Sequence, residues 1–146
     1  MNKYNDLEMT VLSCLLQKPE FMKTTKLKDE HFKSHKRLWK FMQIFYEKYQ
    51  TFDFNLMYAV ASDKYRFMDY MVRIVDFEIL PNNFEKYEDM LILKCYEDKK
   101  EQWIIEQVFG LANKLYIKSI NLGEFKRELE KVYENAEVIF KDGKEE

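Results

Sequence analysis

Apolar residues recur at intervals of three and four positions along most of the chain, the spacing that places side chains on one face of an α-helix. Asp6 can cap a first helix, which Pro19 ends. After a looser segment over residues 20–33, Ser34 can cap a second helix that runs to about Tyr49. The chain has only 3 glycines and 2 prolines. The pattern therefore predicts an all-α protein with long helices.

Three more helices are predicted in the first two thirds of the chain. Asp53 can cap a short one, and Asp63 can cap the next, which runs to about Phe77. A break at residues 80–83 precedes the fifth helix. The polar residues 97–102 contain neither Gly nor Pro, so the fifth helix can continue through them as an exposed neck.

Two helical segments on either side of residues 119–123 predict a hairpin. The later segment carries one narrow apolar stripe with a spacing of three and four: Leu122, Phe125, Leu129, Val132, Ala136 and Ile139. The earlier segment carries a first stripe: Ile104, Val108, Leu111 and Leu115. A second stripe lies about 100° further round the helix: Ile105, Phe109, Ala112 and Tyr116. The returning helix can cover only one of these stripes, so we expect the hairpin to self-associate.

The residues expected at the self-association surface come from both segments of the hairpin. They are Trp103, Ile105, Phe109, Ala112, Tyr116, Phe125, Leu129 and Val132. Trp103 lies on neither stripe, and it either anchors an intermolecular contact or packs back onto the neck or the bundle. The predicted organisation is a compact helical bundle over residues 1–98, a protruding two-helix hairpin over residues 99–140 and a disordered tail over residues 141–146.

The densest basic run lies in residues 23–40, where seven Lys and Arg residues stand against two acidic residues. Four of these cations are candidates for contact with a partner or with phosphate: Lys33, Lys36, Arg37 and Lys40. The alternative is a solvated helix face. His31 and His35 have the spacing of two metal ligands on a helix, but no later His or Cys pair completes a metal site. His35 lies close to an apolar stripe, so we expect a packed, hydrogen-bonded core residue.

Composition and motifs narrow the classes of function. A net charge of −2 and a pI of about 5.8 do not favour nucleic acid as the main partner. The three glycines form no phosphate-binding loop and no nucleophile elbow, so we expect neither catalysis nor a cofactor. Cys14 and Cys95 lie far apart in apolar stretches, which suggests buried free thiols. The sequence shows no signal region and no apolar run long enough to span a membrane, so we expect a cytoplasmic protein.

Several segments, taken in order, resemble the N-terminal domain of bacterial replicative DNA helicases of the DnaB type. LEMTVLSCLL (Leu7–Leu16) is similar to the opening helix of that family, and HFKSHKRLWKFM (His31–Met42) is similar to a later family segment. The matching positions are Glu8, Leu12, Phe32, His35, Leu38, Trp39, Asp53, Asn83, Tyr87 and Leu91. Ser13 stands where the family often has glycine, and Lys36 replaces an arginine.

The resemblance implies a globular bundle and a helical hairpin through which protomers dimerise. In the helicase such dimers form a ring collar that contacts primase and loader proteins. The chain ends where the family would continue into its ATPase domain, so the resemblance implies neither unwinding nor ATP hydrolysis. The chain is either a piece of a helicase or a free-standing relative. Its start at Met1 and its charged tail favour a free-standing protein, such as one from a phage or mobile element.

We therefore expect a non-catalytic DNA-replication module. It would self-associate as a dimer or a higher ring and would dock a replication protein, which is a replicative helicase, a helicase loader or primase. The alternative is a nucleic-acid-binding accessory protein that uses residues 23–40.

Overall fold

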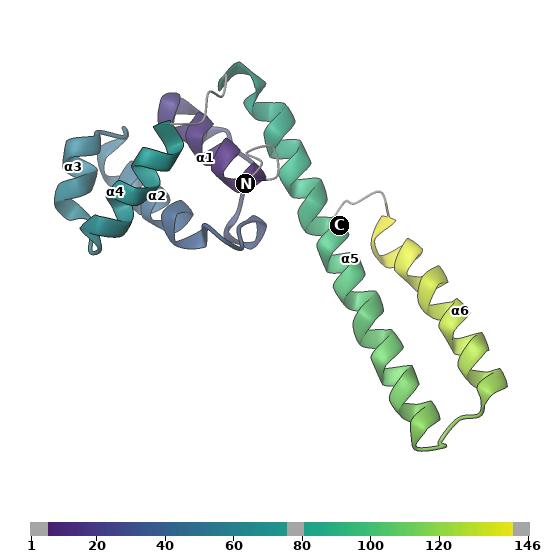
Figure 1. The fold of residues 1–146 in the computed structure, drawn as a ribbon. Helices are drawn as coiled ribbons and strands as arrows, with labels where there is room; N and C mark the ends of the chain where they lie inside the picture. The colour runs from purple at the N-terminus through teal and green to yellow at the C-terminus, as the bar shows by residue number, and fades with distance from the viewer. Residues whose placement is uncertain (1–5, 76–80, 142–146) are drawn as a thin grey trace. The chain divides into compact units, whose positions relative to one another are not determined.

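All regular structure in residues 6–75 and 81–141, the parts that the computed structural model describes, is helical (Figure 1). The α-helices are α1 (Leu7–Gln17), α2 (Lys36–Tyr49), α3 (Phe54–Val60), α4 (Lys64–Val75), α5 (Phe84–Tyr116) and α6 (Leu122–Ile139). Short 3₁₀ turns occur at Pro19–Lys23, Asp29–His31 and Pro81–Asn83. The predicted all-α fold class is confirmed.

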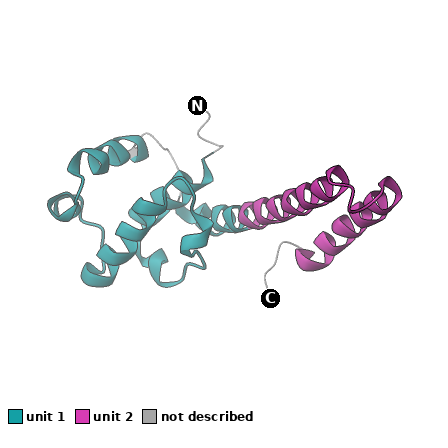
Figure 2. Cartoon of the chain, turned by 90° about the horizontal axis from the view of Figure 1, so that it is seen from below, with its two compact units in different colours: residues 1–92 teal, residues 93–146 magenta. Residues whose placement is uncertain are grey.

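The chain divides into two compact units, Met1–Ile92 and Leu93–Glu146 (Figure 2). The first contains α1 to α4 and the start of α5, and the second contains the rest of α5 together with α6. The sequence analysis placed this boundary after residue 98. Of the predicted tail over residues 141–146, only Lys141 lies within the described residues.

Three of the four predicted helix caps are confirmed. The Asp6 carboxylate accepts a hydrogen bond from the Met9 amide at 3.0 Å, and the Asp53 carboxylate accepts one from the Leu56 amide at 3.1 Å. Asp63 does the same for α4, by accepting from the Arg66 amide at 3.0 Å. These bonds satisfy amides that have no partner inside the helix. The predicted end of α4 near Phe77 lies outside the described residues.

The predicted cap at Ser34 is wrong. Helix α2 begins at Lys36, and the residue before it, His35, makes no side-chain cap. The Glu8 carboxylate of α1 instead accepts hydrogen bonds from three successive amides, those of Lys33 at 3.1 Å, Ser34 at 3.4 Å and His35 at 3.0 Å. A carboxylate near a helix N-terminus also interacts favourably with the helix dipole. The start of α2 is therefore fixed by a residue that is distant in the sequence.

The core of the first unit is built from α1, α2 and the segments around them. Its largest fully buried side chains include Trp39, Phe32, Met9, Leu12, Leu15, Met42 and Met57. The rings of Phe32 and Trp39 stack with their centroids 4.7 Å apart. The Trp39 indole N–H donates to Asp29 Oδ1 at 2.9 Å, so this buried polar group is satisfied.

The polar neck predicted over residues 97–102 is helical. Helix α5 runs for 33 residues without a break from Phe84 to Tyr116, and it includes the whole neck. No proline or internal glycine interrupts the neck itself, so the backbone hydrogen bonding of the helix continues through it.

Candidate interaction sites

The hairpin is held by one apolar seam between α5 and α6, which run antiparallel to each other (Figure 1). On α5 the first stripe, from Ile104 to Leu115, is half-buried, and on α6 Val132 and Ala136 are buried. Lys100 and Glu137 form an ion pair of 2.6 Å between the two helices. The start of α6 is secured by reciprocal hydrogen bonds between Asn121 and Glu124.

The second apolar stripe of α5 is exposed in the single chain. Phe109 is 69% exposed, Tyr116 is 85% exposed and Ile105 is 42% exposed. Viewed along each helix from its N-terminus, the second stripe of α5 lies to one rotational side of the seam. On α6, the exposed residues Leu122 and Tyr133 lie roughly 60–80° round from the seam in the same direction of rotation. In an antiparallel pair, this sense of rotation leads to the same side of the hairpin on both helices. We call this side the hairpin face, formed by Ile105, Phe109, Ala112, Tyr116, Leu122 and Tyr133.

The residues predicted for self-association fall into two groups. Ile105, Phe109, Ala112 and Tyr116 are exposed on the hairpin face. The other four residues pack within the chain. Phe125 and Leu129 are half-buried and Val132 is buried, at positions of the seam. The Trp103 ring meets the Phe140 ring edge-on, with centroids 6.2 Å apart. Self-association itself stays a prediction.

The four cations predicted to contact a partner are all exposed, but their neighbours differ. Lys40 Nζ lies 3.8 Å from Asp29 Oδ2. Arg37, three residues earlier on α2, lines a pocket. Within the same basic run, Lys26 forms an ion pair of 2.9 Å with Asp89. Nearby carboxylates therefore offset part of the positive charge of residues 23–40.

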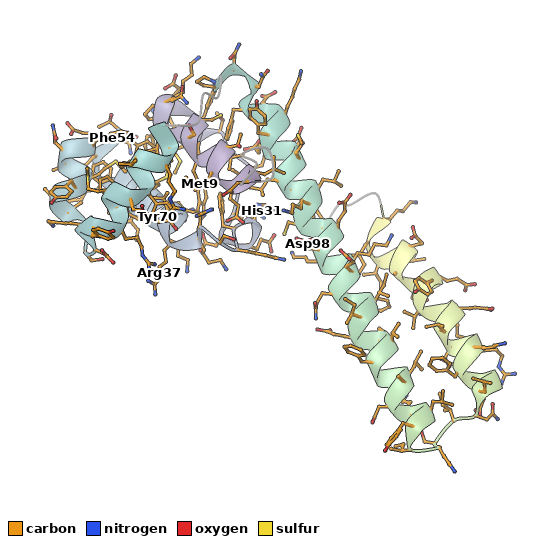
Figure 3. The ribbon with its side chains drawn as sticks, viewed as in Figure 1. Met9, His31, Arg37, Phe54, Tyr70 and Asp98 are labelled. Carbon is orange, nitrogen blue, oxygen red and sulfur yellow. The ribbon has the colours of Figure 1, made fainter. Side chains whose placement is uncertain are left out.

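The pocket beside Arg37 lies between α2, α4 and the connection from α3 to α4, and we call it the α2–α4 pocket. Its volume is about 130 Å³, and it is lined by Arg37, Leu38, Phe41, Ala61, Ser62, Asp63, Arg66, Phe67 and Tyr70. Figure 3 labels Arg37 and Tyr70, which belong to α2 and α4. The sequence analysis named Arg37 as a candidate contact residue but did not predict the pocket, because the other half of the pocket comes from a helix about thirty residues later.

The two histidines take part in hydrogen bonds. His35 is 7% exposed, and its Nε2 lies 3.2 Å from Asp6 Oδ2, while its Nδ1 lies 3.2 Å from the Tyr70 hydroxyl. His31 Nδ1 accepts a hydrogen bond from the Lys28 amide at 2.9 Å. The prediction of a packed, hydrogen-bonded His35 is confirmed. Among the described residues, no group of three or more His, Cys, Asp and Glu side chains could hold a metal ion.

Replacing His35 by Ala tests the role of these hydrogen bonds in stability. We expect His35→Ala to lower the free energy of unfolding by about 1–3 kcal/mol, because Asp6 and Tyr70 lose a partner in a half-buried site. Chemical denaturation followed by circular dichroism measures the change. The control is the exposed neighbour Lys36→Ala, which we expect to stay within about 0.5 kcal/mol of the parent chain. Equal effects of the two substitutions would contradict the structural role of His35.

The cysteines differ in their surroundings. Cys14 is fully buried, and burial raises the pKa of its thiol to about 11, whereas Cys95 is half-buried. Because the thiolate is the reactive form, we expect iodoacetamide at pH 8 to leave Cys14 unmodified in the folded chain and to modify it in urea. Because burial raises the pKa of Cys14, the folded chain holds this proton more tightly than the unfolded chain does. The free energy of unfolding therefore falls as the pH rises from about 9 to about 11. Mass spectrometry of peptides measures the modification, and rapid labelling of Cys14 in the folded chain would contradict its burial.

The fold places the chain among all-α domains, and a comparison with models of protein families identifies the family to which it belongs. Residues 1–92 match the model of the DnaB-like helicase N-terminal domain. The match covers more than half of the 146 residues, so the chain belongs to this family, and the predicted resemblance is confirmed. No curated protein and no solved structure matches the chain. None of the described helices is both long enough and apolar enough to cross a membrane.

The family match and the first compact unit end at the same residue, Ile92. The chain therefore contains a replication-helicase-related module, and this part of the helicase is not the part that carries its catalysis. The seam and the hairpin face both lie beyond the matched residues.

Proposed function

We propose that this chain is a non-catalytic DNA-replication module that self-associates through the hairpin face and docks a replicative helicase, a helicase loader or primase. The family supports a role beside the replicative helicase. The observation that carries self-association is the exposure of Phe109 and Tyr116 on the side of α5 that the seam leaves uncovered. We expect the protein to act in the cytoplasm as a dimer or as a ring of dimers.

The energy for association comes from the hairpin face. Fully burying one large apolar side chain contributes about 1.5–3 kcal/mol, and a two-fold dimer buries each residue of the face twice. A second copy of the same hairpin presents the same apolar face and can cover it. The seam positions Phe125, Leu129 and Val132 contribute indirectly, because they hold α6 beside α5 and so keep Tyr133 on the same face as Phe109.

Light scattering after gel filtration over a range of concentrations tests self-association. Pull-down with purified helicase, loader and primase in high salt tests docking. We expect a dimer or larger assembly and salt-tolerant capture of one of the three proteins. A strict monomer at high micromolar concentration would overturn the self-association, and capture of none of the three would overturn the docking role. Binding to nucleic acid that weakens steeply with salt would support the alternative function through residues 23–40.

A further inference from the structure

We propose that the α2–α4 pocket binds an acidic peptide segment of a partner protein, in which a large apolar side chain stands next to a carboxylate. The proposal rests on the proposed docking function, because it names a site and a ligand chemistry for it. The pocket lies within the first compact unit, between residues of α2, residues of α4 and the short connection before α4.

The floor of the pocket is apolar and held in place by its neighbours. Leu38 and Phe67 are buried, at 4% and 5% exposure, and the Phe41 ring meets the Phe67 ring edge-on with centroids 5.9 Å apart. Tyr70 is fixed by the contact of its hydroxyl with His35 Nδ1 at 3.2 Å. An apolar side chain that enters the pocket therefore meets ring surface that is already ordered, which lowers the entropy cost of binding.

Two arginines line the same pocket, one from α2 and one from α4. Arg37 makes no ion pair with any residue in the described parts of the chain. Arg66 lies 3.9 Å from Asp63 Oδ2, and both side chains are more than half exposed, so this pair is weak and can exchange for another carboxylate. The planar fork of arginine matches a carboxylate, so the charge of the pocket favours an acidic group on the ligand.

The size of the pocket favours a single peptide side chain over larger ligands. Its volume of about 130 Å³ is well below the roughly 300 Å³ or more of sites that enclose a small molecule. Nucleic-acid binding relies on many phosphate contacts, whereas only two cations, Arg37 and Arg66, line this pocket. One apolar side chain with one adjacent carboxylate fits both the volume and the two cations.

Fluorescence polarisation with three labelled probe peptides tests the proposal on the full chain. The first is a short Asp- and Glu-rich peptide with one central Phe, the second has Ala in place of this Phe, and the third has Lys in place of every acidic residue. We expect the first peptide to bind and the other two to bind at least about tenfold more weakly. No binding of the first peptide at millimolar concentration, or equal binding of all three, would overturn the proposal.

Substitutions at exposed positions locate the site without disturbing the core. Arg37→Glu reverses one of the two cations, and Ser62→Trp fills the pocket while both arginines remain. We expect each to weaken binding of the first peptide about tenfold or more, with unchanged circular dichroism. Lys48→Glu is the matched control, because it makes the same change of charge at an exposed residue of α2 that lies outside the pocket and outside residues 23–40. An equal loss in Lys48→Glu would show that only overall charge matters and would overturn the proposal.

The same variants separate this proposal from the proposed function. Arg37→Glu and Ser62→Trp should self-associate as the parent chain does, since both positions lie outside the hairpin. If both variants still capture the purified replication protein as well as the parent chain, the pocket is not the docking site, although the docking function stands. If the parent chain captures none of the three proteins but binds the first peptide with the expected pattern, the pocket is supported and the proposed function fails.

Discussion

The substitution Phe109→Lys should convert the self-associated chain into a monomer. Phe109 is 69% exposed at the centre of the hairpin face, and a two-fold dimer would bury it twice. Losing two buried aromatic side chains removes about 3–6 kcal/mol. Since about 1.4 kcal/mol corresponds to a tenfold change in Kd, the Kd of the dimer should rise by about a hundredfold or more. Light scattering and sedimentation velocity across a concentration series measure this change.

A second exposed apolar residue of the hairpin provides the control for this experiment. Val138 is 76% exposed on α6, and the helical period places it well away from the hairpin face. Val138→Lys makes a comparable change from apolar to charged and should leave the Kd within about threefold of the parent value. If Val138→Lys dissociates the assembly and Phe109→Lys does not, the copies meet through another side of the hairpin.

Replacing Trp39 by Ala should produce the largest loss of stability in the first unit. Trp39 is 1% exposed and stacks on Phe32. Removing a buried tryptophan side chain costs about 3–5 kcal/mol, because the surrounding core closes the cavity only in part. Total stabilities of domains are about 5–15 kcal/mol, so this loss is a large fraction of the free energy of unfolding. Urea denaturation followed by circular dichroism measures the difference.

Trp39→Phe separates the packing of this residue from its hydrogen bond. The smaller ring can still stack on Phe32, but the bond from the indole N–H to Asp29 is lost. Asp29 is half exposed, so water can replace that bond, and we expect a cost well below that of Trp39→Ala, with about 1 kcal/mol from the hydrogen bond. A cost for Trp39→Phe as large as that for Trp39→Ala would show that the hydrogen bond, and not the packing, dominates.

The features that the sequence predicted correctly depend on residues close together along the chain. Asp6, Asp53 and Asp63 each accept from an amide three residues later. The first stripe of α5 and the middle of the α6 stripe, from Phe125 to Ala136, are at least half-buried as the helical period predicts, whereas Leu122 and Ile139 at the ends of the α6 stripe are exposed. The absence of a helix breaker at residues 97–102 likewise allowed α5 to be followed through the neck.

The features that the sequence analysis missed depend on residues brought together by the fold. Ser34 was a reasonable local cap, but Glu8 accepts the amides at the start of α2 across 25 to 27 positions. The α2–α4 pocket joins Arg37 with Arg66 and Tyr70, and no local pattern places these side chains side by side. A single sequence gives the face on which a side chain lies, but not which side chain from another helix faces it.

The two apolar stripes of α5 lie at different angular positions, so the packing of α5 on α6 does not depend on the second stripe. Ile104, Val108, Leu111 and Leu115 hold the two helices together, while Ile105, Phe109, Ala112 and Tyr116 point elsewhere. A related chain could carry different residues in the second stripe and keep the first, and its hairpin would still form. Mixed assemblies with chosen stoichiometry could be engineered in the same way, by placing opposite charges on two versions of this chain.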